Sequence, residues 1–272
     1  MTLLLSELVS GFESLWPLEG AEDWDAPGLV CGSTDSRISR VLLAVDITSE
    51  IVEEALNGEF DLILAHHPFL MRGVTSVSEN TPKGSLISKL IRGGVSVYAA
   101  HTNADIVENG VSDTLAKSFG LRNLRPLTNQ LERIGHGRIG ELEQPMTLLA
   151  FARLVASVLP ATASGVRVAG AHDTIVQKIA LCGGAGDSFI GLAADAGADV
   201  YVSSDLRHHV VQDARESAIL EGGSPAIIDV SHWAAEWLWL EVAASQLGSL
   251  YSETQFVVSA IRTDPWDFTV TQ

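Results

Sequence analysis

Three short segments of the sequence carry side chains that are typical ligands of divalent metal ions. Each segment directly follows a run of apolar residues that resembles a buried strand. The side chains are His66 and His67 in the first segment, Asp105 in the second, and His232 with Glu236 in the third. Imidazole nitrogen and carboxylate oxygen without thiolate sulfur favour Zn, Fe, Mn, Co or Ni. The sequence does not discriminate among these five metals.

The spacing within the segments favours a pair of ions over a single one. Side chains of successive strand residues point to opposite faces, so His66 and His67 are suited to two neighbouring ions. Pro68 restricts His67 to extended geometry. His232 and Glu236 are four residues apart and share one face of a helix, and a glutamate can bridge two ions ~3.5–4 Å apart. Each segment alone is equally compatible with ordinary loop and surface residues, and only their convergence argues for a metal site.

The elements around these segments predict an α/β fold. Apolar runs at 41–46, 62–65 and 95–100 indicate strands, and helices are expected at 49–56, with Ser49 as N-cap, and at 83–92. Strands that alternate with helices run parallel, and their carboxyl ends gather at one rim of the sheet. The three segments are expected to meet there.

The rest of the chain predicts a second unit of the same class. Helices are expected at 147–158, 187–196 and 207–221, with strands at 176–181 and 199–203; strand 226–230 should rejoin the first sheet, and helix 231–246 follows it. We therefore expect two interlinked α/β sandwich domains with mixed, largely parallel sheets and ligands at strand ends. Residues 1–125 with 226–272 would form the metal-site domain, and 126–225 the second domain.

Composition limits the possible partners and location. The chain of 272 residues has 17 basic and 34 acidic residues and a formal net charge of -17, which disfavours nucleic acid and anionic membranes. Its two cysteines have no CxxC spacing, so no disulfide framework is expected and a reducing cytoplasm fits. No run of ~18 apolar residues predicts a membrane span.

The motifs LILAHHPFL, VYAAHTNAD and IIDVSHWAAE, together with WDAPGL near the start, carry a family resemblance. The chain resembles the Nif-three-like dinuclear metal-centre proteins, also described as GTP cyclohydrolase I type 2 homologs, from end to end. The resemblance implies that His66, His67, Asp105, His232 and Glu236 bind two metal ions, with Glu236 as the bridging ligand. It also implies a toroidal homohexamer.

Other polar residues near the segments have less specific roles. His101 is predicted to be catalytic, as a proton shuttle, and Asn103 and His208 to contact substrate. The loop Gly183–Gly186 joins a strand to a helix, where it either holds a substrate phosphate or forms a tight structural turn.

The sequence supports two functional hypotheses, one enzymatic and one noncatalytic. The first is a metal-dependent hydrolase that acts on GTP or a related nucleotide or phosphate compound; for GTP it would open the imidazole ring and release formate. The second is a noncatalytic metal-binding scaffold or regulatory protein, in which the ions support assembly or ligand capture.

Overall fold

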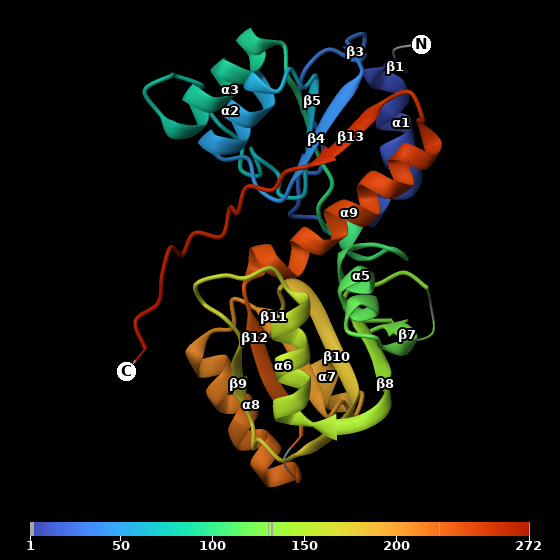
Figure 1. Cartoon of the computed structure of the whole chain (residues 1–272), viewed down its shortest axis with the longest axis vertical. Helices are drawn as coiled ribbons and strands as arrows, with labels where there is room; N and C mark the ends of the chain where they lie inside the picture. The colour runs from blue at the N-terminus through green and yellow to red at the C-terminus, as the bar shows by residue number, and fades with distance from the viewer. Residues whose placement is uncertain (1–2, 130, 132, 223, 272) are drawn as a thin grey trace. The chain divides into compact units, whose positions relative to one another are not determined.

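The computed structural model describes residues 3–129, 131, 133–222 and 224–271. The chain divides into two compact units, each with its own sheet (Figure 1). Unit 1 comprises Met1–Ala104 and Leu240–Thr263, and unit 2 comprises Asp105–Trp239 and Asp264–Gln272. The chain passes between the units within helices α4 (Thr102–Asp105) and α9 (His232–Leu250), and a third time between Thr263 and Asp264.

Unit 1 is built on a five-stranded sheet of order β13-β4-β5-β6-β2. Its strands are β2 (Gly28–Cys31), β4 (Arg40–Ala44), β5 (Leu62–Ala65), β6 (Ser96–Ala99) and β13 (Gln255–Val258). Strands β13, β4, β5 and β6 run parallel, and β2 is antiparallel to β6. A separate ladder pairs β1 (Leu3–Leu4) with β3 (Arg37–Ile38). The carboxyl ends of β5 and β6 therefore lie side by side.

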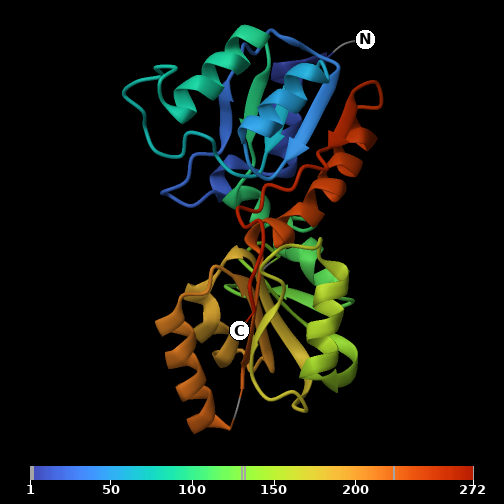
Figure 2. The same cartoon turned by 60° about the vertical axis from the view of Figure 1, so that its left-hand side comes forward.

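Helices cover both faces of this sheet (Figures 1 and 2). Helices α2 (Ser49–Asn57) and α3 (Pro82–Gly93) lie on one face, where Ile51 and Leu90 pack with Ile63 in a fully buried cluster. Helix α1 (Leu5–Leu15) covers the other face and brings the ring of Phe12 within 4.9 Å of the Tyr98 ring. A sheet covered on both faces requires strands that are apolar throughout, which is the pattern that identified them in the sequence.

The ends of the unit 1 helices follow from local side chains. Thr48, one residue before the expected Ser49, caps α2 by accepting a hydrogen bond from the Ile51 amide. Thr81 caps α3 in the same way, with Pro82 at the first helical position. Gly94 ends α3 with a left-handed φ of 71°, which glycine adopts without steric cost.

Unit 2 is built on a six-stranded sheet of order β7-β8-β10-β11-β12-β9. Its strands are β7 (Arg122–Pro126), β8 (Arg138–Thr147), β9 (Arg167–Ala169), β10 (Ile175–Ala185), β11 (Val200–Ser204) and β12 (Ala226–Val230). The central strands β10, β11 and β12 are parallel, and the outer three are antiparallel to their neighbours. The sheet is mixed, with a parallel centre.

Helices again cover both faces of this sheet, as Figure 2 shows for α6, α7 and α8. The helices are α5 (Val111–Ser118), α6 (Leu148–Val158), α7 (Ile190–Asp195) and α8 (His208–Glu221), with a 3-10 turn at Asp187–Phe189; another 3-10 turn, Leu18–Gly20, belongs to unit 1. Ile190 of α7 packs in a buried cluster with Tyr201. The ring of Phe151 on α6 lies 6.0 Å from that of Phe119, which follows α5.

The expected fold class is confirmed, because both units are α/β with mixed sheets. One expected pairing is wrong: the strand at 226–230 does not rejoin the first sheet. It is β12, which pairs residue by residue with β11 from Val200 to Ser204 and with β9 on its other side. The apolar pattern predicted the strand correctly, but a buried strand with two apolar faces fits any central position.

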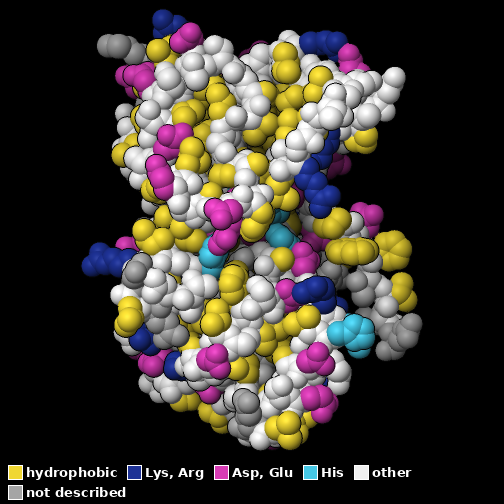
Figure 3. Space-filling view, turned by 180° about the vertical axis from the view of Figure 1, so that it is seen from behind, with side chains coloured by type: hydrophobic (Ala, Val, Ile, Leu, Met, Phe, Trp, Pro, Cys, Tyr) yellow, Lys and Arg dark blue, Asp and Glu magenta, His cyan; other side chains and the backbone are white. Residues whose placement is uncertain are grey.

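The surface carries charges of both signs. On the described part of the face in Figure 3, Lys and Arg side chains are scattered among acidic ones. Among the described residues, no helix is both long and apolar enough to span a membrane.

A buried ion pair holds α5 against β8 in unit 2. The Arg138 side chain is 2% exposed, and its Nε donates to Oδ1 of Asp113 at 3.0 Å. The guanidinium also donates to the carbonyl oxygens of Val107 and Gly137. Burial raises the pKa of Asp113, but hydrogen bonds from Lys117 and Arg138 outweigh it and leave the pKa below its usual value.

Replacing Asp113 by Asn should therefore lower the free energy of unfolding by ~3–5 kcal/mol, because a buried guanidinium loses its counter-charge. The carboxylate stabilises the fold above pH ~4, and this contribution is lost as the pH falls through the lowered pKa. Denaturant unfolding at pH 7 and pH 3 measures both effects, with Asp213→Asn on exposed α8 as the control. Equal stability of the two variants at pH 7 would contradict the assignment.

Candidate metal centre

Three histidines meet at the carboxyl ends of β5 and β6 in unit 1. His66 and His67 directly follow β5, and His101 follows β6 after one alanine, Ala100. Each offers a ring nitrogen, and these atoms lie within 4.8 Å of one another. The ring centroids of His66 and His67 are 5.1 Å apart, and that of His101 lies 5.2 and 5.5 Å from them. His66 and His67 thus lie beside His101 at a strand rim of unit 1, while the meeting of all three segments stays a prediction.

A hydrogen-bond acceptor fixes each of these rings. Nδ1 of His66 donates to the Ala100 carbonyl oxygen at 2.8 Å, and His66 is fully buried. Nδ1 of His67 lies 2.7 Å from Oδ1 of Asp46, and Nδ1 of His101 lies 2.8 Å from Oδ1 of Asp25. An acceptor at Nδ1 places the proton there, so that the Nε2 lone pair is the one available for a metal.

Asp25 is the most firmly held of these acceptors. Its side chain is fully buried and also accepts hydrogen bonds from the backbone amide and hydroxyl of Thr102. Burial raises the pKa of Asp25, but the hydrogen bonds from His101 and Thr102 outweigh it and hold the pKa well below the usual value. Asp25 is thus a fixed negative charge behind His101.

Asn103 lies in the same turn but has a different environment. Its Oδ1 accepts from the His101 amide at 3.0 Å, and its Nδ2 donates to the Trp16 carbonyl oxygen at 2.8 Å. The side chain is fully buried. These bonds position the backbone that carries His101, while the substrate contact expected for Asn103 stays a prediction.

Unit 2 contributes a histidine and glutamate pair at the start of α9. Nε2 of His232 lies 2.8 Å from Oε1 of Glu236, one helical turn later. Nδ1 of His232 lies 2.8 Å from Oδ2 of Asp205. Glu236 is 2% exposed. His232 therefore repeats the arrangement of the unit 1 histidines, because its Nδ1 lies against a hydrogen-bond acceptor, Asp205. Its Nε2 faces Glu236, the other residue of the pair.

The electrostatics of this pair favour a cation. Burial disfavours the imidazolium of His232, but the carboxylates of Glu236 and Asp205 outweigh it and raise its pKa to about 11. The raised pKa favours the protonated form of His232 in the metal-free protein. Metal binding to such a pair displaces that proton.

A glycine makes room for the pair. Gly184, at the end of β10, has a φ of 73°. A Cβ there would lie 2.5 Å from Oε1 of Glu236 and 3.3 Å from Nε2 of His232. The backbone of Gly183–Gly186, at the end of β10, thus passes close to Glu236 and His232. This close approach supports a structural reason for the glycines.

Asp105 and Glu236 both act on the buried thiol of Cys182. Burial raises the pKa of Cys182 to about 12, and the charges of Asp105 and Glu236 add to this effect. Burial therefore favours the neutral thiol in the metal-free protein. The ligand set expected from the sequence contains nitrogen and oxygen donors.

Three supporting residues were not identified from the sequence. They are Asp25, Asp46 and Asp205, which bind Nδ1 of His101, His67 and His232. Asp46 and Asp205 follow strands β4 and β11 by one or two residues, so the rule that located the ligands applies to them too. His208 lies elsewhere in unit 2, in a pocket described below.

Comparison with known proteins bears on this donor set. Residues 3–265 match the family described as Duf34/NIF3 (NGG1p interacting factor 3). The chain belongs to the NIF3 family. A relative in Streptomyces coelicolor called GTP cyclohydrolase 1 type 2 homolog is 42% identical, with 96% of this chain and 93% of the relative aligned. A Clostridium perfringens protein of the same name is 32% identical, with 97% and 99% aligned.

Solved structures of NIF3 relatives share the fold. A Bacillus cereus protein related to NIF3 superposes with a TM-score of 0.89 at 26% identity, covering 99% of this chain and all (100%) of that chain. The Staphylococcus aureus hypothetical protein SA1388 gives a TM-score of 0.89 at 28% identity, with the same coverage. The NIF3 fold and the His and Glu clusters consistent with metal binding thus occur together in this chain.

Proposed function

We propose that this NIF3-family protein binds two divalent metal ions through His66, His67, Asp105, His232 and Glu236. The observation that carries the proposal is the orientation of the histidines. All three in this set present Nδ1 to a hydrogen-bond acceptor, and at His232 a metal ion would replace the proton that favours the contact of Nε2 with Glu236. Histidines that serve only packing or solvation have no reason to present the same ring nitrogen to an acceptor.

The residues fit such a pair of ions. The donors are imidazoles and carboxylates, which suit Zn, Fe, Mn, Co or Ni. Gly184 leaves the space beside Glu236 and His232 that a Cβ would fill.

We further propose that the protein is a metal-dependent hydrolase of the GTP cyclohydrolase kind, acting on GTP or a related nucleotide or phosphate compound. Paired divalent ions lower the pKa of water and stabilise negative charge that develops on a substrate. The relatives' name, GTP cyclohydrolase 1 type 2 homolog, supports the choice of GTP as the first substrate to test.

His101 is the residue of this chain that we assign to proton transfer. Its Nδ1 is held by the buried carboxylate of Asp25, and His101 belongs to the same cluster as His66 and His67. The Asp25 charge stabilises the imidazolium when Nε2 takes up a proton. Thr102 and Asn103 keep Asp25 and the His101 backbone in place.

The hydrolase proposal predicts product formation from GTP. Purified protein loaded with each of the five metals in turn should release formate from GTP, measured enzymatically and by mass spectrometry of the nucleotide product. Glu236→Ala, which removes a proposed ligand, should reduce the rate by at least ~100-fold. Formate at the level of this variant with every metal would reject the cyclohydrolase activity, while metal binding itself is measured separately.

The alternative is a noncatalytic hexameric scaffold in which the ions support assembly. Chelation followed by analytical ultracentrifugation distinguishes the two functions. A hydrolase keeps its assembly state and loses turnover. A scaffold dissociates on chelation and turns over neither GTP nor any member of a phosphoester panel.

A further inference from the structure

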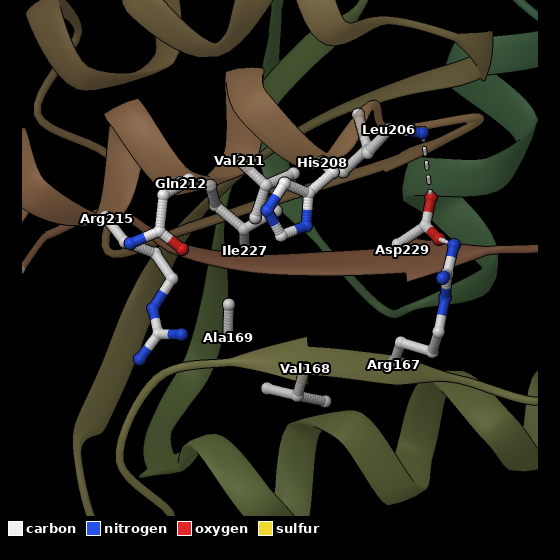
Figure 4. A pocket seen from close by; sticks show the side chains of 10 residues that line it. All are labelled: Arg167, Val168, Ala169, Leu206, His208, Val211, Gln212, Arg215, Ile227 and Asp229. Atoms are coloured by element: carbon white, nitrogen blue, oxygen red, sulfur yellow. Dashed lines mark hydrogen bonds and ion pairs between the residues drawn. The ribbon is translucent and has the colours of Figure 1, made fainter.

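A pocket of about 310 Å³ lies in unit 2 between α8 and the edge strand β9, with β12 behind it. None of the five proposed metal ligands lines it. The lining residues are Arg167, Val168, Ala169, Leu206, His208, Val211, Gln212, Arg215, Ile227 and Asp229 (Figure 4). Its volume is at the lower end of the ~300–1,000 Å³ typical of sites for small molecules.

One face of α8 forms the upper wall of the pocket. His208, Val211, Gln212 and Arg215 recur at the three- and four-residue spacing that aligns side chains on a helix. Figure 4 shows them directed toward Ile227 of β12 and Ala169 of β9. The pocket therefore has an apolar interior below a polar helix face.

The two arginines of the pocket differ in their partners. Arg167 donates to Oδ2 of Asp229, whose Oδ1 accepts from the Leu206 amide at 3.2 Å. Arg215 makes no ion pair with any residue that the structure describes. In Figure 4 the two guanidinium groups lie at opposite ends of the pocket.

The charge of the lining is positive although the chain is strongly acidic. Arg167 and Asp229 compensate each other, so Arg215 contributes one uncompensated positive charge in a chain whose net charge is -17. Glu216, the acid next to Arg215 in the sequence, does not line the pocket, and its Oε1 accepts from Nε2 of Gln212 at 3.3 Å. An anion is the ligand class that this end of the pocket fits.

We propose that this pocket binds a small phosphate monoester or phosphonate with a flat apolar body. Arg215 donates hydrogen bonds to the anion, and the ring nitrogens of His208 are available to the same ligand. The apolar body packs on Ala169, Val211 and Ile227, and the Arg167–Asp229 pair closes the far end. This ligand site is independent of the metal ions and of the hydrolase activity.

Phenylphosphonate is the probe, because it carries both parts of this ligand and no ester bond to hydrolyse. Isothermal titration calorimetry on the full-length protein, treated with a chelator, should show binding. Inorganic phosphate and benzyl alcohol, each with one part of the ligand, should bind more weakly. Arg215→Ala should weaken phenylphosphonate by about tenfold or more, because a charge-assisted hydrogen bond is lost.

Arg153→Ala is the matched control, since Arg153 is an exposed arginine on helix α6 of the same unit and does not line the pocket. It should bind phenylphosphonate as the unmodified protein does. Equal weakening by both variants, or no binding by the unmodified protein, would overturn the proposal. Binding that appears only after metal loading would also overturn it, because the ligand would then be at the ions.

Discussion

Glu236→Gln is expected to weaken divalent metal binding by more than ~100-fold, since even the residues behind metal ligands contribute ~10–100-fold. The substitution keeps the size of the side chain but removes the charge that lies 2.8 Å from Nε2 of His232. Without that charge, one carboxylate fewer offsets the electrostatic cost of a divalent ion at this buried position. Competition titration against a fluorescent chelator measures the change for each metal.

Glu241→Gln is the control for this substitution. Glu241 is exposed on the same helix, α9, and its replacement by Gln removes the same charge from the chain. Its metal affinity should equal that of the unmodified protein. If both variants bind metal equally well, Glu236 is not a ligand.

Gly184→Ala is expected to abolish metal binding without unfolding the protein. The new Cβ would meet Oε1 of Glu236 at 2.5 Å, so the carboxylate has to leave its position beside His232. The left-handed φ of 73° adds a backbone cost of ~1–2 kcal/mol. Metal titration and thermal unfolding of the metal-free protein separate the two effects.

Gly197→Ala isolates the backbone cost. Gly197 also lies in unit 2 with a φ of 69°, but the nearest atom to its Cβ would be Nζ of Lys178 at 3.7 Å. The two variants should lose similar stability, and only Gly184→Ala should lose metal. Retention of metal by Gly184→Ala would show that the geometry of the His232 and Glu236 pair is not needed for binding.

The central strands were predictable because burial on both faces leaves a continuous apolar run. The sequence located β5 and β12 to the residue for this reason. The strands that it missed include β2 and β13 at the edges of the first sheet and β7 and β9 at the edges of the second. These edge strands are short and partly exposed, and β7 and β9 carry arginines, so none of the four shows the long apolar run that identified the central strands.

The candidate site was predictable to the same extent. Side chains that follow central strands meet at a rim, which brings His66, His67 and His101 together. The carboxylates behind the histidines could be identified only from the structure. The chain has 34 acidic residues, and hydrogen-bond geometry alone singles out Asp25, Asp46 and Asp205. The pocket at Arg215 also required it, since β9 was not identified from the sequence.

The metal content of the protein and the atoms that bind the ions decide whether the proposed pair of metal ions exists. Crystals of metal-loaded protein, measured at the absorption edge of the metal, give both in one experiment. We predict two anomalous peaks per chain, with Nε2 of His66, His67 and His232 and carboxylate oxygens of Asp105 and Glu236 as ligands. Peaks elsewhere, or a saturated protein with no ion at His67 and His232, would contradict the proposal.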